Sequence, residues 1–307
     1  MTQSAAVPPM DFFRTANRRR MGDGAISLRM GGLRLRLLGL DDDLERALRE
    51  RFTVYCDDSD TGRSPCLHVD VKSEPRDYFI DPPERAEFNK VLIACDESRV
   101  RYLGYRVAGW FDIGPGRGEL LLAEGTFEPP GRAIENYIRA SVAWYAASLG
   151  GALVHAASAV LGGKGYLFYG ESGAGKSTLS ALNRRARIVS DDLSLVLPDA
   201  GGLALVGSPF RGTYEEGGPV VGRFPLRAGF RIVKSPDVGV DPVPRVQALA
   251  ELVGNLPFVA EAFHRRPDLF TALERAFEGI PLAHLRFRKD ETYWDAIEAS
   301  GLAASSR

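Results

Sequence analysis

A glycine-rich segment at residues 170–178 holds the residues of this chain best suited to chemistry. It reads Gly-Glu-Ser-Gly-Ala-Gly-Lys-Ser-Thr, the pattern G-x-x-x-x-G-K-[ST] of a loop whose backbone N–H groups bind phosphate. The residues expected to contact a nucleoside triphosphate are Gly170, Glu171, Ser172, Gly173, Ala174, Gly175, Lys176, Ser177 and Thr178. Lys176 should reach the β- and γ-phosphates, and Ser177 should offer its hydroxyl to Mg²⁺.

The sequence on either side of this loop agrees with that interpretation. Residues 166–169 are apolar and aromatic, which predicts a strand directly before the loop, and residues 178–182 predict a helix directly after it. A glycine-rich surface turn with an incidental lysine is the alternative, and it leaves both flanks unexplained. The pattern and its flanks together predict an ATP site.

A histidine is expected beside the loop. Residues 152–161 predict a strand, which a turn at 162–165 joins to the strand before the loop. Antiparallel pairing across this hairpin sets His155 opposite residues 170–172. A lone histidine in an apolar strand is either a hydrogen-bonded core residue or a functional group, and the pattern leaves both open. The remaining histidines have no such neighbour and are interpreted as structural; they are His68, His264 and His284.

Two carboxylates follow the loop closely in the sequence. Residues 187–190 predict a strand that ends at Asp191 and Asp192, which lie 15 and 16 residues beyond Lys176. A strand, a helix and a strand in this order bring the carboxyl ends of both strands to one edge of the sheet. Successive strand residues point in different directions, so one carboxylate could hold Mg²⁺ while the other faces the γ-phosphate. The alternative is a surface turn capped by the pair.

These stretches resemble the catalytic domain of HPr kinase/phosphorylase and its relatives. The likeness is carried by Val154-His155-Ala156, the phosphate loop, Val189-Ser190-Asp191-Asp192 and Phe210-Arg211-Gly212. It covers residues 150 to about 235, with a weaker echo at 284–297, and says nothing about residues 1–130. The resemblance implies a phosphoenolpyruvate-carboxykinase-like P-loop core that transfers the γ-phosphoryl group of ATP to a serine hydroxyl.

The resemblance also implies a role for each matching residue. Asp191 matches the acid/base aspartate of the family, whereas Asp192 and Ser177 match magnesium ligands. Lys176 matches the phosphate lysine, and His155 matches the histidine near the reacting hydroxyl.

The stretch 207–225 is rich in glycine and proline, which predicts a mobile loop over the site. Arg211 or Arg223 could steady the transferring group from this loop, and a solvated surface position is the alternative for both. The family has a glutamate two residues before its Arg-Gly segment, where this chain has Pro209. This departure puts the reverse, phosphorylase reaction in doubt.

The function that follows is an ATP- and Mg²⁺-dependent kinase acting on a hydroxyl group. The expected acceptor is a serine of a small protein or peptide, as for shortened relatives encoded beside biosynthetic gene clusters. A kinase of the same core acting on an amino acid or another small molecule stays open, as does a nucleotide-responsive regulator without transfer activity. The resemblance further suggests a homo-oligomer.

Composition limits the remaining function classes. The chain has 307 residues, 45% of them hydrophobic, and a formal net charge of −1, which argues against nucleic acid as the main partner. Its apolar runs fall short of the roughly 20 residues that span a bilayer, and its start lacks the apolar core of a signal peptide, so a cytoplasmic protein without membrane contact is expected. Cys56, Cys66 and Cys95 lack metal or redox spacing and are expected to be small buried hydrophobes.

The expected fold class is α/β, with the P-loop kinase core preceded by a smaller, mostly antiparallel α+β module. We predict a loosely ordered tail at 1–24, the accessory module at 25–130 and the ATP-binding catalytic domain at 131–307.

Local patterns supply the elements around these boundaries. Alternation in residues 33–37 and the pair Gly31-Gly32 predict a hairpin, and Asp41 is placed to cap a helix at 42–52. A helix at 133–149 should pack at the junction of the two modules. Further helices, at 246–255 and 268–277, should help to build the acceptor pocket.

Overall fold

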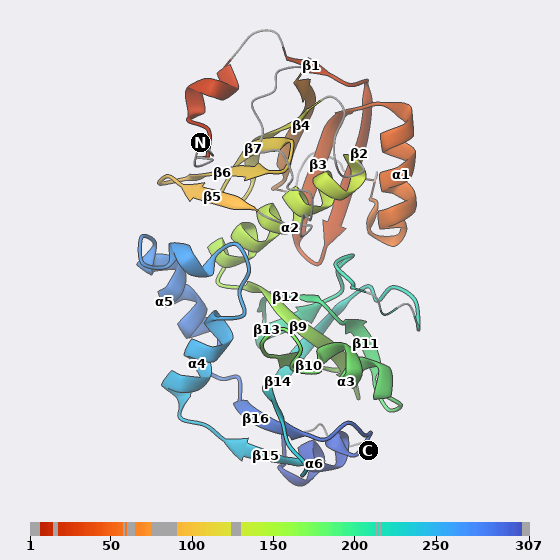
Figure 1. Cartoon of the computed structure of the whole chain (residues 1–307), viewed down its shortest axis with the longest axis vertical. Helices are drawn as coiled ribbons and strands as arrows, with labels where there is room; N and C mark the ends of the chain where they lie inside the picture. Colours follow the sequence, from red (N-terminus) through yellow and green to blue (C-terminus); the bar gives the residue numbers. More distant parts are fainter. Residues whose placement is uncertain are drawn as a thin grey trace, which may run out of the picture. The chain divides into compact units, whose positions relative to one another are not determined.

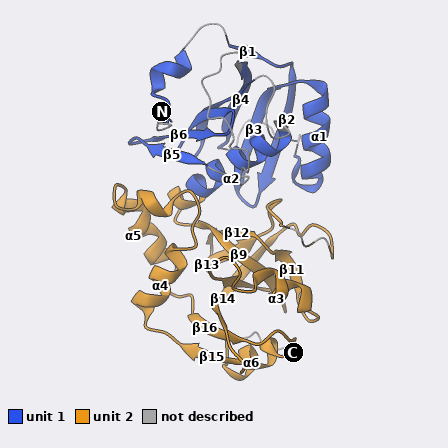
Figure 2. Ribbon diagram, viewed as in Figure 1, with its two compact units in different colours: residues 1–145 blue, residues 146–307 orange. Residues whose placement is uncertain are grey.

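The chain forms two compact units, Met1–Tyr145 and Ala146–Arg307 (Figure 2). The computed structural model describes residues 7–14, 18–57, 59, 65–74, 91–123, 130–212, 214 and 216–302. Each unit is an α/β structure built around an eight-stranded sheet that contains both parallel and antiparallel pairs.

Unit 1 carries α1 and α2 on one face of its sheet, and Phe13 of η1 packs on the other face against Leu103, Ala108 and Leu121 (Figure 1). Its elements are η1 (Met10–Arg14), β1 (Arg19–Arg20), β2 (Gly24–Met30), β3 (Leu33–Leu40), α1 (Asp42–Phe52), η2 (Thr53–Tyr55), β4 (Leu67–Glu74), β5 (Leu92–Cys95), β6 (Arg99–Gly104), β7 (Val107–Asp112), β8 (Gly116–Ala123) and α2 (Pro130–Ser148). The strand order is β2-β3-β4-β8-β7-β6-β5, with β1 against β4. Among the described pairings, β3–β4 and β4–β8 are parallel and the others are antiparallel.

Local chemistry explains the first helix and the first hairpin of unit 1. The Asp41 carboxylate accepts the Leu44 N–H at 2.8 Å, which caps α1 where the sequence predicts. Gly31 has a φ of 60°, a left-handed value that glycine adopts without strain, and it turns β2 into β3. Helix α2 packs through Tyr137 against Gly109 and Gly118, where an added Cβ would come within 2.7 Å of the tyrosine ring or hydroxyl.

The structure differs from two of the expected boundaries. The first difference concerns residues 1–24, for which a loosely ordered tail is expected. Residues 10–14 form η1, which buries Phe13, and residues 19–20 form β1, which pairs with β4. Some of the other residues in 1–24 lie outside the described ranges. The division between units falls after Tyr145 and not at residue 130. The physical reason is that α2 packs on unit 1. Its Tyr137 packs edge-on against Tyr102 and Phe111 of the sheet, at ring-centroid distances of 5.5 Å, and its Glu135 is ion-paired with Arg51 of α1 at 3.0 Å.

None of the three cysteines forms a disulfide. Cys66 is buried, as expected for a small hydrophobe, whereas Cys56 and Cys95 are half-buried.

Unit 2 contains the strands and helices that surround the glycine-rich loop. Its elements are β9 (Ala152–Leu161), β10 (Lys164–Tyr169), α3 (Lys176–Leu182), β11 (Arg187–Ser190), β12 (Leu193–Asp199), β13 (Gly202–Val206), β14 (Arg223–Lys234), β15 (Gly239–Pro242), α4 (Arg245–Val253), η3 (Ala260–Ala262), α5 (Pro267–Ala276), β16 (Leu282–Phe287) and α6 (Tyr293–Ala299). The strand order is β10-β9-β12-β13-β14-β16-β15, with β11 against β9.

The long strand β14 closes part of this sheet on itself. Its first residues pair with β13, and from Leu226 onward it pairs in parallel with β10. Strands β9, β10, β14, β13 and β12 therefore form a closed ring of pairings. This closure fixes the strand that enters the glycine-rich loop from both sides.

The crossover from β10 through α3 to β11 follows the expected course. Both β10 and β11 pair antiparallel with β9, which lies between them, so they run in the same direction. Their carboxyl ends consequently reach the same edge of the sheet. An aromatic core holds one face of this sheet, with Trp294 of α6 packed edge-on against Tyr166 and Phe168 at ring-centroid distances of 5.2 and 5.7 Å.

Candidate functional site

The glycine-rich loop runs from the end of β10 to the start of α3, and its backbone curves around the ammonium group of Lys176. Gly173 and Gly175 have φ values of 76° and 114°, which residues with a Cβ rarely adopt. The Lys176 ammonium donates to the backbone oxygens of Gly170 at 2.7 Å and Glu171 at 3.2 Å. The first N–H groups of α3 lack partners within the helix and are available to a ligand. The loop thus has the backbone shape that phosphate binding requires.

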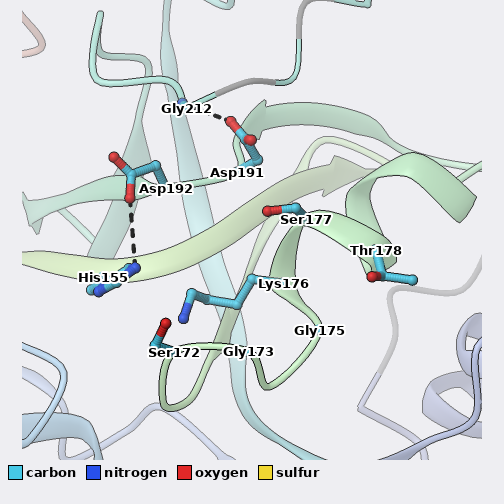
Figure 3. Close-up of a pocket in the computed structure, with 10 residues that line it drawn as sticks. All are labelled: His155, Ser172, Gly173, Gly175, Lys176, Ser177, Thr178, Asp191, Asp192 and Gly212. Carbon is cyan, nitrogen blue, oxygen red and sulfur yellow. Dashed lines mark hydrogen bonds and ion pairs between the residues drawn. The ribbon is translucent and has the colours of Figure 1, made fainter.

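The hairpin of β9 and β10 brings His155 to this loop, as the sequence predicts. Tyr169 pairs with Ala156, so the next position along the hairpin sets His155 opposite Gly170. The His155 backbone N–H donates to the Asn255 oxygen at 2.8 Å, which ties β9 to the residues after α4. The imidazole itself lies at the same cavity as Lys176 (Figure 3).

The two aspartates after β11 point in different directions (Figure 3). Asp191 is 4% exposed, and its carboxylate accepts two backbone N–H groups, from Gly212 at 2.8 Å and from Tyr214 at 3.1 Å. Asp192 turns toward β9, where its Oδ1 lies 3.5 Å from Nε2 of His155. Asp191 is therefore held by backbone N–H groups, whereas Asp192 lies beside the His155 imidazole.

The electrostatics of the site favour a neutral imidazole. Burial lowers the pKa of His155, and the nearby Lys176 lowers it further, against a weaker opposite effect of Asp192. Burial also lowers the pKa of Lys176, while Asp192 raises it. At neutral pH, His155 is accordingly an uncharged group with a free nitrogen lone pair beside an aspartate.

One cavity of about 360 Å³ collects these side chains. Its lining residues are His155, Ser172, Gly173, Gly175, Lys176, Ser177, Thr178, Asp191, Asp192 and Gly212. Of the residues expected to contact a nucleotide, Gly170, Glu171 and Ala174 belong to the loop without lining the cavity. Gly212 was not among the expected site residues, although the Arg-Gly pair at 211–212 was the signal that could have indicated it.

The two arginines of the 207–225 stretch do not line this cavity. Arg211 donates to the backbone oxygens of Gly218 at 2.6 Å and Glu216 at 3.0 Å. Arg223 donates to the Pro198 oxygen and lies 3.3 Å from the Asp199 carboxylate. In this structure both arginines brace backbone turns.

The residues present fit a magnesium ion that arrives with a triphosphate. Within the described part of the chain, no group of three or more histidine, cysteine or acidic side chains forms a metal cage. Mg²⁺ commonly binds one or two carboxylates and takes its other ligands from phosphates and water. The Ser177 hydroxyl and the Asp191 and Asp192 carboxylates, which line the same cavity, supply that smaller set.

A polar group beside the loop has no counterpart in the sequence patterns. Tyr169, Arg231 and His284 are paired neighbours on β10, β14 and β16, and Glu251 of α4 bonds His284 at 2.7 Å. Arg231 lies 3.6 Å from Glu171 of the loop and 3.7 Å from Glu251. Only strand pairing brings these positions together, so no spacing along the chain could have indicated them.

No described helix is both long and apolar enough to cross a membrane. A scan against protein-family models finds no match to the chain, and a search of curated proteins finds no significant match either.

Proposed function

We propose that unit 2 is an ATP- and Mg²⁺-dependent kinase that transfers the γ-phosphoryl group to a hydroxyl. The observation that carries the proposal is the convergence on one cavity of the phosphate loop, His155 and the two aspartates. Phosphoryl transfer needs little covalent chemistry from a protein, and positioning together with charge neutralisation provides most of the rate. The residues at this cavity are of the types that provide both.

The loop residues bind and orient the nucleotide in this proposal. Lys176 exchanges its two backbone oxygen partners for the β- and γ-phosphates, which are stronger, charged acceptors. Ser177 and one carboxylate hold the Mg²⁺ of the substrate, which neutralises charge on the triphosphate. The backbone N–H groups at the start of α3 complete the phosphate contacts.

We assign the base to Asp192, acting beside His155, and the fixed carboxylate to Asp191. The resemblance to HPr kinase/phosphorylase implies the opposite order. Two backbone N–H donors hold the Asp191 carboxylate in a fixed orientation, which suits a metal ligand. The side chain of Asp192 is 32% exposed, and its carboxylate lies beside a neutral imidazole at the cavity, where an acceptor hydroxyl can approach it.

The transfer step moves one proton and one phosphoryl group. Asp192 takes the proton of the acceptor hydroxyl as its oxygen bonds to the γ-phosphorus. The bond between the γ-phosphorus and the β–γ bridging oxygen breaks, and ADP leaves with that electron pair. Lys176 stabilises the charge that develops on the leaving oxygen.

We propose a serine of a small protein or peptide as the acceptor, on the strength of the sequence resemblance, and the cytoplasm as the site of the reaction. A small-molecule hydroxyl would suit the same step. The two acceptor classes differ in the product, so the test of the proposed function also separates them.

The test compares Lys176→Ala with Lys164→Ala, which removes an equivalent charge from the exposed first residue of β10. Calorimetric titration with Mg²⁺-ATP should show binding for the parent chain and Lys164→Ala, and a strong loss for Lys176→Ala. Incubation with γ-labelled ATP and cell extract, followed by mass spectrometry, then identifies a labelled peptide or small molecule. Equal nucleotide affinity of the two variants would remove the phosphate-loop assignment, and binding without any labelled product would favour a nucleotide-responsive regulator.

A further inference from the structure

The sheet of unit 1 has one apolar face, beneath α1 and α2, and a second face that is polar on β3 and β4. Across β6, β7 and β8 the second face is apolar, because Phe13 of η1 packs there against Leu103, Ala108 and Leu121. Strand β3 shows the difference, because Leu35 and Leu37 are buried beneath the helices while Arg34 and Arg36 alternate with them on the other side. The polar face carries arginines on several strands of the sheet. The polar part of such a sheet face is commonly solvated, so the charges on it need a closer account.

Three cationic or titratable side chains form a continuous row on this polar face. Arg36 of β3 pairs with His68 of β4, and His68 pairs with Arg117 of β8. Neighbouring strands lie about 4.8 Å apart and paired residues point to the same face, so the three side chains start within about 10 Å of one another. We call Arg36, His68 and Arg117 the cationic row.

The acids around the cationic row already have partners. Asp57 lies 3.5 Å from Arg29 and 3.7 Å from Arg34, and Asp70 is paired with Arg20. Glu119 bonds Lys72 at 2.6 Å. Asp112, the neighbour of Arg117 across β7 and β8, takes two hydrogen bonds from Arg99 at 2.8 and 2.9 Å. Among the described residues, these pairings leave the cationic row without an acid to neutralise it.

The side chains of the cationic row have no hydrogen bond or ion pair to any residue that the structure describes. The Nε of Arg36 is moreover buried without a hydrogen-bond acceptor. A buried donor left unsatisfied is destabilising, and a ligand that supplies an acceptor recovers that cost. Guanidinium groups bind carboxylates and phosphates through paired N–H donors, so the missing acceptor is anionic.

We propose that the cationic row binds an acidic segment of a protein or peptide. The row is three strands wide, which suits a few carboxylates of an extended chain laid across it. Nucleic acid fits less well, because it needs a run of phosphate contacts and the acids Asp57 and Asp70 flank the row. This proposal concerns unit 1 alone and does not depend on phosphoryl transfer.

The test measures binding of a fluorescent peptide of alternating glutamate and serine to the full chain, without nucleotide, by fluorescence anisotropy. We expect the double variant Arg36→Gln/Arg117→Gln to bind about tenfold or more weakly, since both guanidinium groups lose their charged hydrogen bonds to the peptide. Arg46→Gln is the control, because it removes an exposed charge from α1, where Arg46 is ion-paired with the exposed Asp43. Circular dichroism establishes that each variant is folded.

A charge exchange makes the test independent of small losses in stability. Arg36→Glu/Arg117→Glu should release the glutamate peptide and bind the corresponding lysine peptide, which the parent chain should not bind. Equal peptide affinity of the double glutamine variant and Arg46→Gln would overturn the proposal. Tighter binding of a single-stranded oligonucleotide than of the acidic peptide would overturn it in favour of a nucleic-acid surface.

Discussion

Asp191 and Gly212 are joined side chain to backbone: the Oδ1 of Asp191 accepts the Gly212 N–H at 2.8 Å, and the glycine has no room for a side chain. A Cβ added at Gly212 would lie 2.9 Å from Oδ2 of Asp191 and 3.1 Å from the Cβ of Asp192. Gly212 thus constrains the positions of both aspartates.

Gly212→Ala should therefore impair the reaction more than nucleotide binding. The added methyl group displaces the carboxylates, and a displacement of about 1 Å can cost about 10²-fold in rate. Gly201→Ala is the control, since an added Cβ there meets no atom within 4 Å. Turnover and ATP affinity should be measured for both variants. Equal turnover of Gly212→Ala and Gly201→Ala would show that this contact does not position the site.

The two aspartates should respond differently to the loss of charge. Asp192→Asn should keep ATP affinity and lower turnover by about 10²- to 10⁴-fold, the usual contribution of a positioned general base. Asp191→Asn should raise the Mg²⁺ concentration needed for half-maximal rate, because its carboxylate is fixed for a metal and an amide binds metal weakly. If excess Mg²⁺ restores Asp192→Asn but not Asp191→Asn, the assigned roles are reversed.

The charge state of His155 gives a prediction for pH. Its pKa is lowered in the folded chain, so the imidazole is neutral at pH 7 and gains its proton only at a pH below its ordinary range. The rate should accordingly be level near neutrality and fall on the acid side. Proton NMR titration should show the His155 pKa rising in Lys176→Met, which removes a positive neighbour, and falling in Asp192→Asn. A His155 pKa unchanged in both variants would contradict the electrostatic coupling.

Two buried tyrosines should respond to loss of the hydroxyl with opposite signs. The Tyr169 hydroxyl is buried and has no hydrogen-bond partner within the described residues, whereas the Tyr137 hydroxyl donates to the Trp110 oxygen at 2.6 Å. Tyr169→Phe removes an unsatisfied polar group and should raise the free energy of unfolding by about 1 kcal/mol. Tyr137→Phe leaves an acceptor unpaired and should lower it by about 1 kcal/mol or more. Urea unfolding measures both, and a destabilised Tyr169→Phe would indicate a partner for that hydroxyl.

The hairpin and crossover around the loop could be predicted from the sequence because their determinants are local. The apolar strand at residues 152–161, the glycines after it and the loop pattern fix a register that places His155 opposite Gly170, and the structure has that register. The cap at Asp41 and the turn at Gly31 were predictable for the same reason, since each depends on a few adjacent residues.

Other features depended on packing between distant segments. No sequence pattern shows that α2 belongs with unit 1, because an apolar helix face can pack on either unit. The contact of Tyr137 with Gly109 and Gly118, which are distant in the sequence, places α2 on the sheet of unit 1. Strand alternation likewise places Arg36 on a polar face but cannot say which residues stand beside it on β4 and β8.

The sequence by itself determined that a glycine-rich loop, a histidine and two aspartates meet at one sheet edge, because chain direction and strand periodicity require it. The tertiary structure decided what surrounds each aspartate there. Asp191 and Asp192 are adjacent and identical in type, and only the return of residues 212–214 to the sheet gives one of them two backbone N–H donors and leaves the other to His155. Such a difference arises from contacts 20 or more residues apart, which no local pattern encodes.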